Sequence, residues 1–431
     1  MCPLLTTLLQ PRSGRYRPDM SHDAPPPVGD RNIDGGIDVE RLRRETPGLT
    51  RRIHLNHAGA SPSPDAVVDT VVEHLRLEAE LGGYEAAELA APRLQAARTS
   101  VATLLGCAPT DVAFTAGATD AWQRVFWSFP WQPGDVVLVG RSEYVANALA
   151  LLRAERAAGV RVEVVDDDAS GQIDVGALEQ RLRAAPVALV SLVHVPTSSG
   201  LVNPAAAVGA VCRAAGVPLL LDACQSVGQL PTDVEELGCD ALTATGRKFL
   251  RGPRGTGFLY VRRTLLDRLD PLFVDGNSAT WTSAREYELS PGALRFEAFE
   301  RNHAALLGLG RAVDDALELG LNAIAERVTA LGTRLRALLE RVPGVQVRDP
   351  GSTRCGIVTF TVDGHTALDV RNRLAADGVQ VWTSSAVHAQ LDLPHRDLHE
   401  VVRASVHYVT TDDELDRTAE LVAGISGARR A

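Results

Sequence analysis

Residues 241–261 read ALTATGRKFLRGPRGTGFLYV, and the interpretation of the whole chain begins with this stretch. An apolar run is followed by Lys248 and then by Gly252, Gly255 and Gly257, which allow a tight loop with close backbone approach. The chain has 44 Lys and Arg residues, and Lys248 is the only lysine. Arg replaces Lys in most ion pairs, but not where an amine must lose its proton and attack a carbonyl. Lys248 is therefore a candidate nucleophile, and the alternative is a surface lysine without a role.

Two features near strand ends are suited to a phosphate group. The stretch FTAGATDAW, residues 114–122, joins a strand to a helix through Gly117, so the amides of Ala118 and Thr119 open that helix. Free N–H groups and the helix dipole attract an anion. Thr245 and Arg247, which flank Lys248, can also reach a phosphate. The alternative for the first feature is an ordinary turn.

Three further polar residues suit an organic cofactor and its substrate. Asp222 ends the apolar run VPLLLD, residues 217–222, where a carboxylate either caps a helix or pairs with a protonated ring nitrogen. Gln225, three residues later, is placed to donate to a ring oxygen. Arg403, in VVRASVHYVTT at residues 401–411, is expected at the head of a strand. Its planar guanidinium matches a carboxylate, and the alternative is a surface ion pair.

The surrounding pattern predicts an α/β protein. Apolar, partly β-branched runs alternate with helical segments, which favours a mostly parallel sheet covered by helices on both faces. The runs lie at residues 112–115, 136–139, 161–165, 187–194 and 217–222, and helices are predicted at 66–81, from 118, at 146–158 and at 205–215. A long helical stretch from about residue 300 precedes further strands in GIVTFTV (356–362), VQVW (379–382) and RASVHYV (403–409).

We expect four parts in the chain. Residues 1–38 are predicted to be a disordered tail, because they are rich in Pro, Gly, Arg and Asp, and Met20 is a candidate true start. Residues 39–63 are expected to pack with a small domain. The remaining chain divides into a large cofactor-binding domain, residues 64–295, and a small α+β domain, residues 296–431.

Composition excludes several classes of protein. A formal charge of −10 argues against a nucleic-acid partner, because phosphate binding needs clustered positive charge. Apolar runs of about 18 residues are absent, so no membrane span is expected, and no basic leader precedes the first apolar patch. The six cysteines are widely spread without a CxxC pair, so neither a metal site nor a disulfide framework is expected, and a reducing cytoplasm is the predicted location.

The order of these features is similar to that of one family. The order Gly-Ala-Thr, then His194, then Asp222 and Gln225, then Lys248, then Arg403 resembles that of the class V aminotransferases. These pyridoxal-phosphate enzymes of fold type I include cysteine desulfurases, isopenicillin N epimerase and C–S lyases. The resemblance runs from LNHAGASPSP at Leu55 to Asp416. It implies the fold type I architecture, pyridoxal 5′-phosphate as the cofactor, an amino-acid substrate and a homodimer.

The resemblance also assigns roles to individual residues. Lys248 would bind the cofactor as a Schiff base, Asp222 would pair with its ring nitrogen, and Gln225 would contact its ring oxygen. Tyr144, in SEYVANALA at 142–150, would lie against the cofactor face. The implied phosphate ligands are Ala118, Thr119, Thr245 and Arg247, and the implied substrate ligands are Arg403, Thr197 and Asn56.

Two departures from the family pattern affect the predicted reaction. Cysteine desulfurases carry a persulfide-forming cysteine on a loop before the C-terminal Arg, whereas the matching residues here, 381–400, contain no cysteine. Many relatives have Gly-Thr after a Phe-Glu pair and use it for a cross-dimer phosphate contact, whereas this chain has FEAFERN at 296–302. A persulfide mechanism is therefore disfavoured, and the phosphate contact must differ.

One further segment indicates the reaction. LEAELGGYEAAELAAPRL, residues 77–94, resembles a segment of ergothioneine-type C–S lyases, and the alternative is an amphipathic helix broken at Gly82 and Gly83. We therefore predict β-elimination from a cysteine S-conjugate, giving pyruvate and ammonia. The amine of Lys248 would remove the Cα proton, and Tyr144 is a candidate to protonate the leaving sulfur.

Other activities remain open at this point. An epimerase or racemase needs a second acid, for which Tyr144 or His57 is a candidate. An aminotransferase and a non-catalytic binding subunit with the same fold are the further alternatives.

Overall fold

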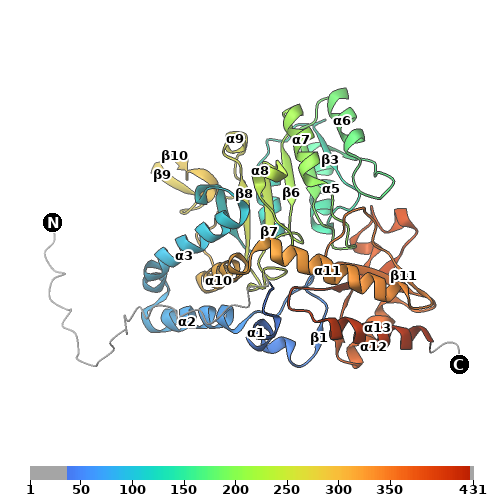
Figure 1. Ribbon diagram of the computed structural model, residues 1–431. Coiled ribbons are helices and arrows are strands. Elements are labelled where there is room, and N and C mark those ends of the chain that lie inside the picture. The colour runs from blue at the N-terminus through green and yellow to red at the C-terminus, as the bar shows by residue number, and fades with distance from the viewer. Residues whose placement is uncertain (1–35, 428–431) are drawn as a thin grey trace, which may run out of the picture. The chain divides into compact units, whose positions relative to one another are not determined.

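The computed structural model describes residues 36–427 (Figure 1). The predicted tail lies outside this part except for residues 36–38, and Met20 lies outside it altogether.

Seven strands form the central sheet in the order β2-β8-β7-β6-β5-β3-β4. Every neighbouring pair is parallel except the two pairs made by β8, which runs antiparallel to both β2 and β7. The mostly parallel sheet is therefore confirmed. Its strands are β2 (Val112–Thr115), β3 (Val136–Val139), β4 (Arg161–Val164), β5 (Leu189–Val193), β6 (Leu219–Asp222), β7 (Ala241–Thr245) and β8 (Gly257–Val261).

Helices bury both faces of this sheet. Successive residues of a strand point to opposite faces, and those of β3 enter two different apolar clusters. Val136 and Leu138 belong to one cluster, and Val137 and Val139 belong to the other. The first cluster includes residues of α6 (Val175–Ala184) and α7 (Ala205–Ala215), and the second includes residues of α4 (Ala118–Phe126) and α5 (Val145–Ala158). Two short helices, α8 (Val234–Leu237) and α9 (Arg263–Leu266), complete this region.

The helical stretch after residue 300 is two helices, α10 (His303–Leu319) and α11 (Leu321–Glu340), which meet at Gly320 with a φ of 85°. α10 lies beside α2 (Asp65–Leu81) and α3 (Gly83–Leu105). The contact is close because α10 has glycines there: a Cβ on Gly310 would lie 2.5 Å from the Cβ of Ala97. The domain boundary at residue 296 stays a prediction, although α10 follows it and packs on helices that precede it.

The C-terminal region contains a four-stranded antiparallel sheet in the order β11-β12-β15-β14. It carries α12 (Ala367–Ala376) and α13 (Asp412–Gly427), and its strands are β11 (Val345–Val347), β12 (Ile357–Val362), β14 (Trp382–Ser385) and β15 (Glu400–Ser405). Near the N-terminus, α1 (Val39–Arg44) precedes β1 (Ile53–His54), which pairs in parallel with β13 (Val379–Gln380).

Two predicted strands are corrected by the structure. VQVW is not one strand, because residues 379–380 pair with β1 while the chain from Trp382 pairs with β15. RASVHYV leaves the sheet after Ser405, where the amide of Val406 donates to Gly356 and a turn follows at His407. Arg403 therefore lies inside β15 and not at its head.

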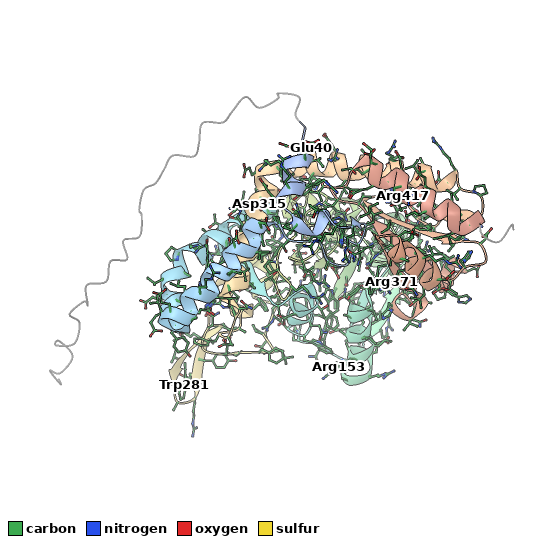
Figure 2. The ribbon with its side chains drawn as sticks, turned by 90° about the horizontal axis from the view of Figure 1, so that it is seen from below. Glu40, Arg153, Trp281, Asp315, Arg371 and Arg417 are labelled. Atoms are coloured by element: carbon green, nitrogen blue, oxygen red, sulfur yellow. The ribbon has the colours of Figure 1, made fainter. Side chains whose placement is uncertain are left out.

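A two-stranded hairpin, β9 (Ala279–Ser283) and β10 (Glu286–Leu289), extends away from the helices, with Trp281 on its outer part (Figure 2). Across residues 36–427, we find no helix with the length and apolar character needed to cross a membrane.

Candidate active site

A cavity of about 320 Å³ lies at the carboxyl ends of β2, β6 and β7. Open parallel sheets bind ligands at this edge, where loops from separate strands converge. Nine of the predicted site residues line it: Ala118, Thr119, Tyr144, Thr197, Asp222, Gln225, Thr245, Arg247 and Lys248. Arg403 and Asn56 are not among the lining residues, but Arg403 donates to Thr197, which lines the cavity, and to Asn56.

One end of the cavity is the uncapped N-terminus of α4. Gly117 precedes the helix, and no side chain caps it. The first amide with an intrahelical partner is that of Ala121, which donates to Gly117, so the amides of residues 118–120 remain available. β8 comes close enough that a Cβ on Gly257 would lie 2.5 Å from the Cα of Gly117. Two glycines therefore keep this anion-binding end open, and a phosphate fits it.

Thr245 and Arg247 border the same cavity. The Thr245 hydroxyl donates to the carbonyl of Thr256 at 3.0 Å, and its oxygen can still accept or face a ligand. The Arg247 guanidinium donates to the carbonyl of Gly59 at 3.0 Å. Within residues 36–427 no carboxylate lies within salt-bridge distance of Arg247. Its charge is thus available to an anionic ligand.

Asp222 ends β6 and is almost fully buried, with 4% of its surface exposed. One carboxylate oxygen accepts the amide of Cys224 at 2.9 Å, and the other accepts the side-chain amide of Asn147 at 3.0 Å. Burial raises the pKa of Asp222, and the two hydrogen bonds and Lys248 oppose this. A buried carboxylate of this kind suits a cationic ring nitrogen, as predicted from the sequence.

Behind Asp222 lies a second layer that sequence reasoning did not find. The side-chain amide of Asn147 also donates to Glu143 at 2.9 Å, and Glu143 accepts the amide of Tyr144 at 2.7 Å. Burial raises the pKa of Glu143 to about 8. The signal was present as polar residues in SEYVANALA, at the start of an otherwise apolar helix.

Lys248 follows β7, and 6% of its surface is exposed. Burial lowers the pKa of its amine, as do the guanidinium groups of Arg247 and Arg403, while the adjoining thiol of Cys224 raises it. A lowered pKa favours the neutral, nucleophilic amine. The loop is fixed by the buried Arg251, which has a φ of 64° and donates to the carbonyl of Pro62 and the hydroxyl of Tyr408.

Gln225 and Tyr144 both line the cavity. The Gln225 amide nitrogen donates to Ala58 and to the Thr197 hydroxyl, both at 3.1 Å, and its oxygen has no partner. The Gln225 nitrogen therefore already donates to two protein oxygens, and only the Gln225 oxygen is without a partner. The predicted donation from Gln225 to a ring oxygen of the cofactor stays a prediction. Burial raises the pKa of the Tyr144 phenol, which keeps it protonated.

Arg403 is a buried cation with 5% of its surface exposed. It donates to the carbonyl and hydroxyl of Thr197 and to the side-chain oxygen of Asn56 at 3.3 Å, while its Nε has no partner. Burial and Arg247 lower the pKa of Arg403 to about 10. No carboxylate of the described chain pairs with it, so a buried charge is left to be balanced by a ligand. A substrate carboxylate fits this requirement, with Asn56 and Thr197 orienting the guanidinium.

The two sequence departures have structural counterparts. In residues 381–400, the Ser384 hydroxyl donates to the carbonyl of Thr197 at 3.2 Å, and the segment offers no thiol. Glu297 of FEAFERN is buried and pairs with Arg98 and Arg301, so that segment stabilises the fold. One thiol, that of Cys224, does line the cavity. Cys224 lies in sequence between Asp222 and Gln225, and the sequence analysis assigned no role to it.

His57, the other candidate for a second acid, does not line the cavity. It is fully buried, its Nδ1 lies 2.8 Å from the Ser61 hydroxyl, and its ring packs 4.7 Å from that of His407. Burial lowers its pKa well below the ordinary value, so it is neutral. The segment 77–94 also stays away from the cavity lining, and the chain bends there at Gly82, between α2 and α3.

The fold and the cavity together define a pyridoxal-phosphate enzyme of fold type I, because the buried acid, the amine and the anion-binding helix end match that cofactor. Residues 53–418 match the aminotransferase class-V family model, and the chain belongs to this family. Pyridoxal 5′-phosphate is therefore its cofactor.

Relatives with assigned names agree with the family. The chain is 31% identical over 406 residues to a cysteine desulfurase of Serratia proteamaculans (strain 568), covering 90% of this chain and 97% of the relative. Its fold matches an apo structure of a cysteine desulfurase from Thermococcus onnurineus NA1, with a TM-score of 0.84, 23% identity and coverage of 90% and 98%. It also matches a cystine C–S lyase in complex with cysteine persulfide, with a TM-score of 0.79, 23% identity and coverage of 88% and 99%.

Proposed function

We propose that the protein cleaves the carbon–sulfur bond of a cysteine S-conjugate by β-elimination. Arg403 is buried and has no carboxylate partner within residues 36–427, which supports an α-amino acid as substrate, because its guanidinium matches the substrate carboxylate. The names of relatives, a cysteine desulfurase and a cystine C–S lyase, support cleavage at a carbon–sulfur bond.

When bound, pyridoxal phosphate supplies an electron sink that stabilises negative charge at Cα. Asp222 would hold its ring nitrogen, and the N-terminus of α4 with Thr245 and Arg247 would hold its phosphate. Lys248 would bind the cofactor as a Schiff base until the substrate amine takes its place. The Lys248 amine released in this exchange, with its lowered pKa, would then remove the Cα proton. The sulfur leaves with the electron pair of the Cβ–S bond, and the protonated Tyr144 phenol supplies a proton to it. The three-carbon enamine that remains would be hydrolysed by water at its carbon–nitrogen bond, which gives pyruvate and ammonia.

The observation that carries elimination is the lack of a sulfur-accepting thiol in residues 381–400. A desulfurase transfers sulfur to a nucleophilic thiolate. The thiol that does line the cavity, Cys224, has its pKa raised by burial, so it is poorly suited to attack sulfur. Release of the sulfur group to solvent therefore fits the site better than transfer to the protein.

Cysteine desulfuration is the second candidate, because the named relatives include cysteine desulfurases and Cys224 adjoins Lys248. The two reactions give different carbon products. Holoenzyme would be incubated with cystine, S-alkyl cysteines and cysteine, and pyruvate and alanine would be measured separately. Elimination predicts pyruvate, which persists in Cys224→Ala. Alanine from cysteine, lost in Cys224→Ala, would establish desulfuration, and inversion at Cα without either product would indicate an epimerase.

We further propose that the protein is a homodimer. Large apolar side chains are exposed around the turn between α2 and α3 and on the β9–β10 hairpin, where Tyr287 and Trp281 are cross-strand partners. Soluble monomers rarely expose such groups together. The exposed residues are Tyr84, Leu89, Phe273, Trp281, Tyr287 and Phe299.

A further inference from the structure

Three metal-ligating side chains meet between α2 and α10, away from the cofactor cavity lining. His74 and Glu78 are four residues apart on α2, which places them on one face of the helix, and His303 is the first residue of α10. One ligand atom from each lies within 4.8 Å of the others. The rings of His74 and His303 are arranged edge-to-face, with an interplanar angle of 72° and their centroids 6.4 Å apart. Each residue therefore directs a ligand toward the same space.

His74 lacks the partners that a buried histidine normally has. Its surface is 1% exposed, and neither ring nitrogen makes a hydrogen bond to any residue in 36–427. Most buried polar side-chain atoms are satisfied, so two free nitrogens on one buried ring call for a partner. Among the residues that the structure describes, the one charged group within salt-bridge distance of His74 is the Glu78 carboxylate.

The contact between His74 and Glu78 is short but not aligned as a hydrogen bond. His74 Nε2 and Glu78 Oε1 are 3.1 Å apart, but the two atoms do not form a hydrogen bond. Two ligands that bind one tetrahedral ion at about 2.0–2.1 Å lie roughly 3.4 Å apart and point at the ion rather than at each other. The separation of 3.1 Å is that of an ion pair and is also close to this ligand–ligand distance, so the two side chains lie near enough to bind one ion.

We propose that His74, Glu78 and His303 bind a divalent transition-metal ion, with Zn²⁺ as the ion that this ligand set suits. Two imidazoles and one carboxylate are a common three-residue zinc set, and water completes the coordination. The Glu78 side chain is 32% exposed, which gives an ion and its water a route from solvent. The cysteine spacing gave no sign of this site because it uses none of the six cysteines.

An ion at this place would have a structural role. It would join α2 to the first turn of α10, directly after Glu300, Arg301 and Asn302. These three residues line a second cavity of about 210 Å³, which shares Ala116, Asp120 and Gly255 with the cofactor cavity. Binding of the ion would therefore fix a wall next to the cofactor without supplying chemistry to it.

The test uses the full-length holoenzyme, stripped of metal with a chelator and then titrated with Zn²⁺ against a chromophoric chelator. We expect about one equivalent to bind to the wild type, and His303→Gln and Glu78→Gln each to weaken binding by about tenfold or more. The matched control is His365→Gln. His365 forms an i,i+4 pair with Asp369 at 2.7 Å but belongs to no three-ligand group in the described chain, so this variant should bind Zn²⁺ as the wild type does.

Thermal unfolding gives a second readout. Zn²⁺ should raise the midpoint of the wild type and of His365→Gln, but not that of His303→Gln, because an ion that binds only the folded state stabilises it. The near-visible cofactor spectrum should be the same in all of them. Failure of the wild type to bind Zn²⁺, or equal loss of binding in His303→Gln and His365→Gln, would overturn the proposal. Neither result depends on which reaction the enzyme catalyses.

Discussion

Asn147 offers the sharpest test of the cofactor site, because it touches Asp222 without lining the cavity. Its side chain is 1% exposed in the first turn of α5. The same amide group donates to Asp222 at 3.0 Å and to Glu143 at 2.9 Å. The substitution Asn147→Ala would leave the buried Asp222 carboxylate with the Cys224 amide as its one remaining donor.

The size of the effect follows from this loss. Removing a hydrogen bond to a charged buried group costs about 1.5–3 kcal/mol. The pKa of Asp222 is already raised by burial, and losing the Asn147 contact would raise it further. An Asp222 that is more often protonated pairs less well with a ring cation. We therefore expect the Kd for pyridoxal phosphate to increase roughly 10- to 150-fold, since about 1.4 kcal/mol corresponds to a factor of ten.

The assay is a titration of apoprotein with pyridoxal phosphate, followed by the near-visible absorbance that appears on binding. Ser191→Ala is the matched control, because the Ser191 hydroxyl donates to Glu143 at 3.5 Å, whereas the side-chain hydrogen bonds of Asp222 come from Cys224 and Asn147. Circular dichroism would establish that both variants are folded. The reasoning is refuted if Asn147→Ala binds the cofactor within about threefold of the wild type, or if Ser191→Ala loses as much affinity.

Four further outcomes are expected. Lys248→Ala should abolish the near-visible band in absorbance spectra while leaving the far-ultraviolet dichroism intact, whereas an unchanged band would remove Lys248 as the attachment point. Arg403→Gln should lower kcat/KM for amino-acid substrates about 100-fold or more, with cofactor affinity unchanged in the titration, because a charged hydrogen-bond partner of the carboxylate is lost. The pKa of Glu143 is raised from 4.5 to about 8, so in this pH range the folded protein keeps a proton that the unfolded chain releases. The free energy of unfolding of the apoprotein should therefore fall as the pH rises from about 4.5 to 8, by at most about 1.4 kcal/mol per pH unit. Urea unfolding at several pH values should show a shallower fall in Glu143→Gln, and parallel curves would contradict the assignment. Trp281→Arg should shift the mass measured by light scattering toward that of one chain, and a single-chain mass for the wild type would exclude the dimer.

Sequence could locate the first layer of the site because it depends on where strands end. Apolar runs that stop at Thr115, Asp222 and Thr245 place their following residues at one edge of a parallel sheet. The glycine before Ala118 and the single lysine were visible in the same way. These positions follow from local pattern and topology alone.

The direction of β8 was also encoded, although it was not predicted. Only residues 246–256 separate β7 from β8, and they contain the Lys248 loop and no helix. A parallel return needs a crossover of about a dozen residues or more, usually with a helix. The strand therefore had to run antiparallel to β7, which brings Gly257 against Gly117.

The second layer of the site, Glu143 and Asn147, could not be predicted from the sequence because it depends on tertiary packing. The link from Glu143 through Asn147 to Asp222 depends on how the first turn of α5 lies over β6, and 75 residues separate Asn147 from Asp222. The pairing of His74 with His303 likewise arises from the packing of α2 on α10, two helices far apart in the chain. Side-chain contacts between such distant elements are set by packing rather than by periodicity.

The charges around Lys248 show why two anions are needed to complete the site. Arg247 and Arg403 both lower the pKa of the Lys248 amine, and Arg247 lowers that of Arg403. Neither guanidinium is balanced by a carboxylate of residues 36–427 within salt-bridge distance. Arg403 is buried and Arg247 is half-buried, and like charges in such a place are costly unless a ligand offsets their repulsion. Arg247, beside the N-terminus of α4, is positioned for the phosphate, and Arg403, held by Thr197 and Asn56, is left for the carboxylate of an amino acid. An amine that lacks the carboxylate would leave Arg403 uncompensated, and for this reason we expect such amines to be poor substrates even where the leaving sulfur group is the same.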